Sequence, residues 1–147
     1  MERIALMKHF LTTLSVSALL AFALTTFGAS ELIDATPETV VGATTVAAGQ
    51  AKALFDDEAA FVDLRKENMW NSGRIPGAIW LDFKTAFSAD TLAAEVDKDE
   101  KVVFYCSGVR CPRSSKASAR AVEWGYSQVY YFREGFPAWK KANYPVE

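Results

Sequence analysis

Histidine is almost missing from this 147-residue chain, which has only His9. If the first thirty residues are removed, as argued below, no histidine remains. This excludes a Cys-His protease, a Ser-His-Asp hydrolase and any histidine metal site. Cysteine is also scarce, and the pair Cys106 and Cys111 is too small a set for a zinc site. The formal net charge of −2 lacks the excess of basic residues that is typical of nucleic-acid-binding proteins, so we expect no nucleic-acid partner.

The first thirty residues have the pattern of a secretory signal. A start with basic residues is followed by an apolar run from Phe10 to Phe27 and by small residues. We therefore expect residues 1–30 to be a signal peptide, cleaved after Ser30 or Ala29, and the protein to be periplasmic or otherwise exported. The alternative is an uncleaved membrane anchor, for which the run is barely long enough. Membrane contact is expected only in that case.

The rest of the chain has the pattern of one α/β domain. Residues 31–39 form a polar lead-in, read as an ordinary connector, and residues 40–147 form the domain. Short apolar runs alternate with helical segments, which predicts a parallel sheet flanked by helices on both faces. Thr44 or Thr45 is predicted to cap the first helix. The predicted strands lie within 59–65, 78–81, 101–106 and 127–132, and the predicted helices within 46–57, 84–96, 113–125 and the closing segment 134–147.

Three chemically active side chains fall at the ends of predicted strands. Asp63 and Arg65 end one strand, and Cys106 ends another. Parallel sheets carry their ligands beyond the carboxyl ends of the strands, so these residues are expected at one site. For Asp63 and Arg65 we favour an ion pair that fixes the strand end over direct contact with a substrate.

The segment CSGVRCPRSS joins a predicted strand to a predicted helix. Backbone N–H groups of such a loop, together with the positive end of the helix, hold an anion without any side-chain charge. A cysteine at the first position is stabilised there as its nucleophilic thiolate. Arg110, Arg113 and Lys116 add positive charge nearby. Cys106 can thus be activated without histidine; the alternative is an inert, small apolar side chain.

Three further segments resemble the single-domain rhodanese (sulfurtransferase) family. They are FVDLR, SGRIPGAIWLDF and EGFPAWKKANYPV, and Cys106 stands at the position of the family's nucleophile. The resemblance covers about residues 40–147 and implies a rhodanese-like parallel sheet flanked by helices on both faces. It also implies transfer of sulfane sulfur from a small thiosulfate-like anion, through a persulfide on Cys106, to a thiol or cyanide acceptor. This chemistry needs no cofactor and no metal.

The resemblance also implies the residues of the site. Cys106 is expected to be catalytic, and Asp63, Arg65 and Cys111 to support it. Two departures from the family pattern stand out: Arg74 replaces the usual histidine, and six residues instead of four separate Cys106 from the Arg-Ser pair. A longer loop admits a larger substrate. The residues expected to bind the substrate are Ser107, Gly108, Val109, Arg110, Cys111, Arg113 and Ser114.

Other functions stay open at this point. A cysteine phosphatase would use the longer loop, although no aspartate stands at a recognisable general-acid position. A thiol redox protein would use the cysteine pair, although its spacing differs from Cys-x-x-Cys. A non-catalytic module would use the basic pocket to hold an anion or a partner.

The two cysteines raise a separate hypothesis. Nearby thiols oxidise in exported proteins, but bonding depends on the Cα separation, which the sequence does not give. We expect a reversible Cys106–Cys111 disulfide that switches sulfur transfer off, and that is easily reduced because a stabilised thiolate leaves readily. The alternatives are that Cys111 resolves the persulfide or is a packed, inert thiol.

Overall fold

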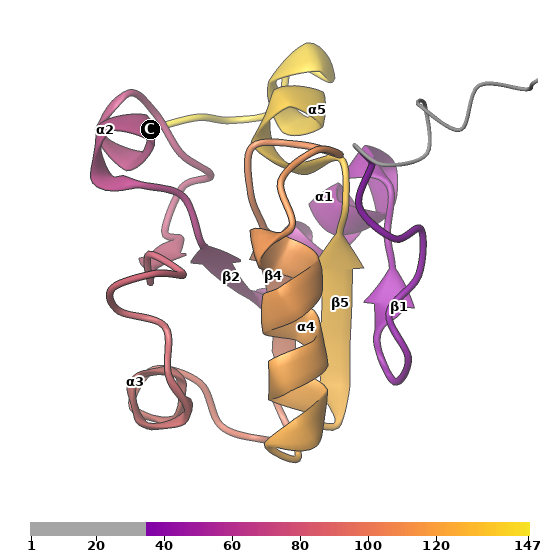
Figure 1. Cartoon of the computed structure of the whole chain (residues 1–147). Helices are drawn as coiled ribbons and strands as arrows, with labels where there is room; N and C mark the ends of the chain where they lie inside the picture. Colours follow the sequence, from indigo (N-terminus) through magenta and orange to yellow (C-terminus); the bar gives the residue numbers. More distant parts are fainter. Residues whose placement is uncertain (1–34) are drawn as a thin grey trace, which may run out of the picture.

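The computed structural model describes residues 35–147 (Figure 1). The predicted signal peptide, residues 1–30, lies outside the described residues. In the part that is described, no helix has the length and apolar character needed to cross a membrane. The elements are β1 Thr44–Thr45, α1 Ala48–Asp56, β2 Ala60–Asp63, α2 Glu67–Asn71, β3 Ile79–Trp80, α3 Ala89–Ala93, β4 Lys101–Tyr105, α4 Arg113–Glu123, β5 Gln128–Phe132 and α5 Gly135–Lys141.

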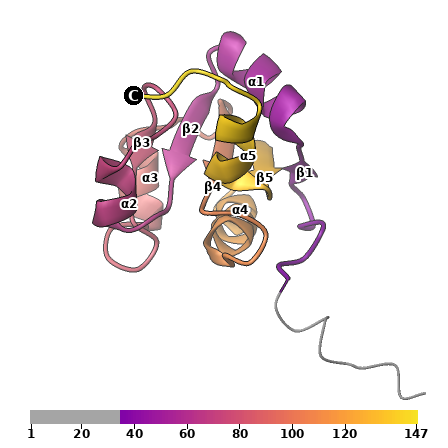
Figure 2. The ribbon, with the colours of Figure 1, turned by 90° about the horizontal axis from the view of Figure 1, so that it is seen from above.

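The strands form one parallel sheet in the order β1-β5-β4-β2-β3. Successive side chains of a strand point to opposite faces, so β4 serves two cores. Val102 and Phe104 pack with residues of α3 and α4, whereas Val103 and Tyr105 pack with residues of α1 and α5. Figure 2 shows α1 and α5 on one side of the row of strands and α4 on the other. The predicted α/β fold, a parallel sheet flanked by helices on both faces, is confirmed.

The predicted cap of the first helix is wrong. Thr44 and Thr45 form the short edge strand β1, which pairs with Tyr130 and Tyr131 of β5. The helix begins after Ala47, whose backbone N–H donates to the Gln50 side chain at 3.0 Å. Two β-branched residues suit an edge strand, but a strand of two residues has no period to read.

The predicted helix over residues 84–96 is much shorter in the structure. Residues 82–87 form a turn in which the Asp82 carbonyl accepts N–H groups from Thr85, Ala86 and Phe87. Helix α3 begins only after Ser88, whose hydroxyl accepts the Thr91 N–H at 3.2 Å. A serine side chain that satisfies an early helical N–H is a strong start signal, and here the helix starts at Ala89, five residues past Lys84.

Candidate active site

Cys106 lies at the carboxyl end of the central strand. Strand β4 ends at Tyr105, and a loop runs from Cys106 to Pro112, where α4 begins with Arg113. In Figure 1 this orange loop stands above α4, at the end of the sheet to which the β5 arrow points. The strand-loop-helix arrangement predicted for this segment is present.

The two cysteines are bonded to each other in the structure. Their Cα atoms are 6.3 Å apart, a separation usual for disulfides. Cys106 is 2% exposed, whereas Cys111 is partly exposed at the far side of the loop. The predicted link between the cysteines is therefore present, while its reversibility and its effect on activity remain predictions.

The disulfide borders a pocket of about 270 Å³ that has cationic and neutral walls. None of the lining residues is acidic, and three are basic. A pocket of this charge suits an anion. The lining residues are Arg65, Lys66, Asn68, Met69, Cys106, Ser107, Cys111 and Arg113.

Residues of the cysteine loop line two different pockets. Ser107 borders the cationic pocket, and it also borders a neighbouring hollow of about 430 Å³ beside α5. Gly108, Val109 and Arg110 line only that second hollow of the two. Ser114 is buried in the first turn of α4, and its hydroxyl has no hydrogen-bond partner among the described residues. The loop residues predicted to bind one substrate thus face different spaces in this oxidised form.

Arg113 holds the start of α4 against the end of β2. Its guanidinium donates to the Leu64 carbonyl at 2.9 Å and lies 3.7 Å from the Asp82 carboxylate. The same side chain borders the cationic pocket. Its observed contacts are those of a structural brace, and contact with a substrate remains a prediction.

Asp63 and Arg65 form the ion pair predicted from the sequence, behind the pocket. Both are buried, and an oxygen of Asp63 lies 2.6 Å from a guanidinium nitrogen of Arg65. Arg65 also donates to the Gly73 carbonyl at 2.8 Å, and its guanidinium lies 4.3 Å from the Phe136 ring centre. Opposite charges that share several hydrogen bonds hold a guanidinium in one orientation. The pair thus fixes the Arg65 side chain at the wall of the pocket.

Tyr105 completes this buried cluster, and no sequence pattern predicts its role there. Its hydroxyl donates to Asp63 at 2.7 Å and accepts the Ile75 N–H at 3.3 Å. Burial, and next the neighbouring Asp63 carboxylate, raise the pKa of Tyr105 well above its usual value. The phenol therefore stays protonated and continues to donate to Asp63. A tyrosine in an apolar strand carries no pattern that distinguishes this role from simple packing.

Thr36, in the described part of the lead-in, is hydrogen-bonded to the cysteine loop, so this residue is not part of an ordinary connector. Thr36 is buried, and both its N–H and its hydroxyl donate to the Val109 carbonyl at 2.8 Å. Tyr131 donates to the Thr36 hydroxyl at 3.0 Å, and Arg133 donates to the Thr36 carbonyl at 2.9 Å. These hydrogen bonds restrain the loop at Val109.

Gly135, at the start of α5, lets the backbone approach Cys106 closely. Its φ is +63°, and a Cβ built there would lie 2.3 Å from the Cys106 carbonyl oxygen. The next N–H, from Phe136, donates to that same oxygen at 3.0 Å. A side chain at this position would therefore push α5 and the cysteine loop apart.

We expect Gly135→Ala to lower the free energy of unfolding by about 2–3 kcal/mol, since it adds a backbone clash to an unfavourable φ. Gly77→Ala is the matched control, because Gly77 has a φ of +67° with nothing within 4 Å of its Cβ position. The control should lose only about 1 kcal/mol. Urea denaturation of both variants measures the difference, and equal losses would contradict the clash.

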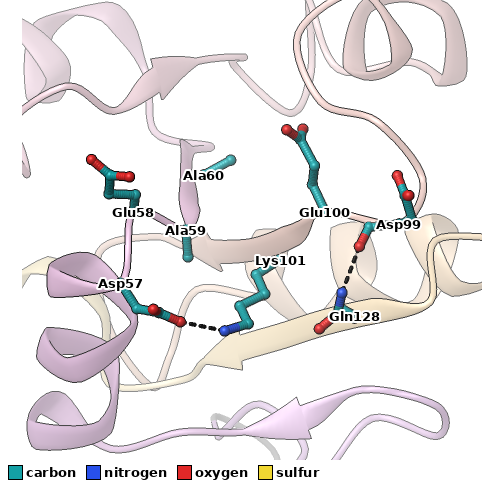
Figure 3. Close-up of a pocket in the computed structure, with 8 residues that line it drawn as sticks. All are labelled: Asp57, Glu58, Ala59, Ala60, Asp99, Glu100, Lys101 and Gln128. Carbon is teal, nitrogen blue, oxygen red and sulfur yellow. Dashed lines mark hydrogen bonds and ion pairs between the residues drawn. The ribbon is translucent and has the colours of Figure 1, made fainter.

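A further pocket, of about 320 Å³, lies at the opposite end of the sheet (Figure 3). The Lys101 ammonium donates a hydrogen bond there to the Asp57 carboxylate. This hydrogen bond, and next the negative charge of Asp57, raise the pKa of Lys101. Gln128 donates to the Asp99 carbonyl at 2.5 Å. Within residues 35–147, no group of three or more His, Cys, Asp or Glu residues is placed to hold a metal ion. This pocket lies at the amino ends of β2, β4 and β5, away from the cysteine loop.

Comparison with known proteins identifies the class. Residues 47–142 match the family model of the rhodanese-like domain, and the chain belongs to this family. It is 37% identical over 99 residues to the thiosulfate sulfurtransferase GlpE of Pseudomonas savastanoi pv. phaseolicola, which covers 67% of this chain and 87% of that protein.

Two longer proteins match this chain over a part of their length. Over 93 residues the chain is 36% identical to the tRNA uridine(34) hydroxylase of Erwinia tasmaniensis, covering 60% of this chain but only 26% of that protein. The crystal structure of a thiosulfate sulfurtransferase from Pseudomonas aeruginosa superposes with a TM-score of 0.60 at 23% identity, covering 71% of this chain and 20% of that one. This structural likeness concerns the fold, and the chain spans about a quarter or less of either protein.

Proposed function

We propose that the protein is an exported sulfurtransferase that moves sulfane sulfur from a thiosulfate-like anion to a thiol or cyanide acceptor. The observation that carries the proposal is the position of Cys106 at the end of β4, beside a pocket lined by Arg65, Lys66 and Arg113 and by no acidic residue. Family membership and the similarity to a thiosulfate sulfurtransferase support the same chemistry. An anionic donor fits the charge of the pocket.

The reaction has two displacement steps on sulfur. The thiolate of reduced Cys106 attacks the outer sulfur of thiosulfate, the sulfur–sulfur bond of the donor breaks, and sulfite leaves with the bonding electron pair. The product is a persulfide on Cys106. Cyanide then attacks the outer sulfur of the persulfide and leaves as thiocyanate, which restores the thiolate.

The residues around Cys106 support the first step electrostatically. Helix α4 starts seven residues after Cys106, and its positive end favours an anion at the loop. Lys66 and Arg65 line the pocket, and the buried contact with Asp63 keeps the Arg65 guanidinium oriented. These groups stabilise the thiolate, the bound donor and the departing sulfite without a histidine.

The disulfide makes prior reduction a requirement of this mechanism. In the bonded form Cys106 has no thiolate to attack a donor. We therefore expect the air-oxidised protein to be inactive and a dithiol reductant to activate it. Thiocyanate formation from thiosulfate and cyanide, measured before and after reduction, tests this.

Hydrolysis of a generic phosphate ester is the comparison assay. Thiocyanate formation without ester hydrolysis is the expected result for residues 31–147 expressed as the mature protein. Ester hydrolysis without thiocyanate formation by the reduced protein would reject the proposal and favour a phosphatase.

Export is the second part of the proposal, and it rests on the apolar run from Phe10 to Phe27. We expect protein recovered from the periplasm of its native host to begin at Ser30 or Glu31, according to the cleavage site. Intact-mass measurement of the periplasmic and membrane fractions tests this. Full-length protein in the membrane fraction would favour an anchor instead.

A further inference from the structure

Cys111 lies closer to Cys106 than any external thiol can come. The sulfur atoms of the two residues form a disulfide, and their Cα atoms are 6.3 Å apart. Both cysteines border the same cationic pocket as Arg65 and Arg113. Reduction therefore leaves a second thiol beside the nucleophile, inside the proposed donor site. Neither displacement step of the sulfurtransferase reaction uses this thiol.

We propose that Cys111 resolves the persulfide and releases its sulfur as hydrosulfide, so that the protein reduces sulfane sulfur at the expense of a dithiol. The inference rests on the proposed function, because it requires the persulfide on Cys106. It adds an activity to simple transfer: the sulfur leaves as a free reduced product, and the protein ends in the disulfide form. A dithiol reductant of the thioredoxin-like chemical class then restores the two thiols.

The bonds and electrons balance within one turnover. The Cys111 thiolate attacks the inner sulfur of the persulfide, which is the Sγ atom of Cys106. The Cys106–Cys111 bond forms, the bond to the outer sulfur breaks, and that sulfur leaves with the electron pair and one proton as HS⁻. Two cysteine thiols are oxidised to a disulfide, and the sulfane sulfur is reduced to sulfide. Sulfite has already left in the first step.

Geometry favours Cys111 over an external thiol in this step. The Cys106 residue is only 2% exposed, so a free thiol reaches its Sγ poorly. Cys111 is held at bonding range by the loop, in which its own N–H donates to the Gly108 carbonyl at 2.9 Å. Confinement of two reacting groups in one loop raises their effective concentration far above that of a dissolved thiol.

The different exposure of the two cysteines also determines which sulfur of the disulfide a reductant attacks. Cys111 is partly exposed, whereas Cys106 is buried, so an incoming reductant meets the Cys111 sulfur first. Attack there expels Cys106 as a thiolate, and the basic pocket and the start of α4 stabilise that leaving group. The nucleophile is therefore the first group set free for the next donor.

A single-turnover experiment tests the inference on the mature protein. The protein is reduced, freed of reductant and kept anaerobic, and then mixed with one equivalent of thiosulfate and no acceptor. Wild type should release about one equivalent each of sulfite and sulfide and become about 2 Da lighter than the reduced protein. Cys111→Ser should release sulfite, keep the sulfur, and become about 32 Da heavier.

A second variant, Cys111→Ala, guards against an effect of the new hydroxyl and should also stop at the persulfide. Melting curves compare both variants with the reduced wild type, since none of these forms has the disulfide. Wild type that keeps the added mass and releases no sulfide would overturn the inference while leaving the proposed function intact. Sulfide release from Cys111→Ser equal to that of wild type would overturn it equally.

Two other outcomes are informative. Added sulfur found on Cys111 by peptide mapping would mean that Cys111 attacks the outer sulfur and relays it, which contradicts hydrosulfide release. If wild type and both variants release no sulfite and gain no mass, the persulfide does not form. The proposed function and this inference then fail together, and the absence of sulfite identifies that case.

Discussion

Cys106→Ser is expected to lower the kcat/KM for thiocyanate formation by a factor on the order of a thousand or more. The serine oxygen cannot form a persulfide, and residues 31–147 have no histidine to activate a hydroxyl. In the single-turnover experiment this variant should release no sulfite and keep the mass of its reduced form, because neither a persulfide nor a disulfide can form without Cys106. The measurement is thiosulfate–cyanide transfer by the reduced variant beside the reduced wild type.

The fold should survive this substitution. Cys106 is buried, but serine is of similar size, and the main loss is the disulfide itself. The proper reference for stability is therefore the reduced wild type, and melting curves should agree closely between the two. Cys111→Ser is the matched variant, because it also removes the disulfide but should still gain sulfur. A well-folded Cys106→Ser protein with near-normal transfer would remove Cys106 from the proposed mechanism.

Arg65→Met should lower the free energy of unfolding by about 3–5 kcal/mol, because it leaves the buried Asp63 carboxylate without its cation. Asp63 is 0% exposed and accepts from the backbone N–H, Nε and Nη2 of Arg65. After the substitution only the backbone N–H and the Tyr105 hydroxyl remain as donors. The contact of the guanidinium with the Phe136 ring is lost too.

Arg74→Met is the matched control for this prediction. Arg74 also pairs with an acid, Glu147 at 2.8 Å, and also lies over an aromatic ring, that of Trp70 at 4.3 Å. Its ion pair is exposed to water, with side-chain exposures of 29% and 46%. Exposed pairs contribute little, so the control should lose about 1 kcal/mol or less. Urea denaturation measures the free energy of unfolding of both variants. Similar losses in the two would show that the stabilising effect of the Asp63–Arg65 pair does not come from its burial.

The sequence by itself determined the central architecture and the place of the chemistry. Continuous apolar runs predicted the strands that became β2, β4 and β5, because a strand covered on both faces has no polar side to show. The end of each run placed Asp63 and Cys106 at the same edge of the sheet. The pairing of Asp63 with Arg65 followed from two opposite charges only two residues apart, at a strand end that had to be buried.

Only the tertiary structure decided the features that depend on partners far away in the chain. Strand β1 exists because β5 offers an open edge to Thr44 and Thr45. Thr36 gains its role from the Val109 carbonyl, 73 residues away, and Tyr105 from Asp63, 42 residues away. The bond between Cys106 and Cys111 depended on a Cα separation that the fold of the loop sets. Local patterns specify period and polarity, whereas these contacts arise when packing brings distant backbone and side chains together, and no local pattern contains that information.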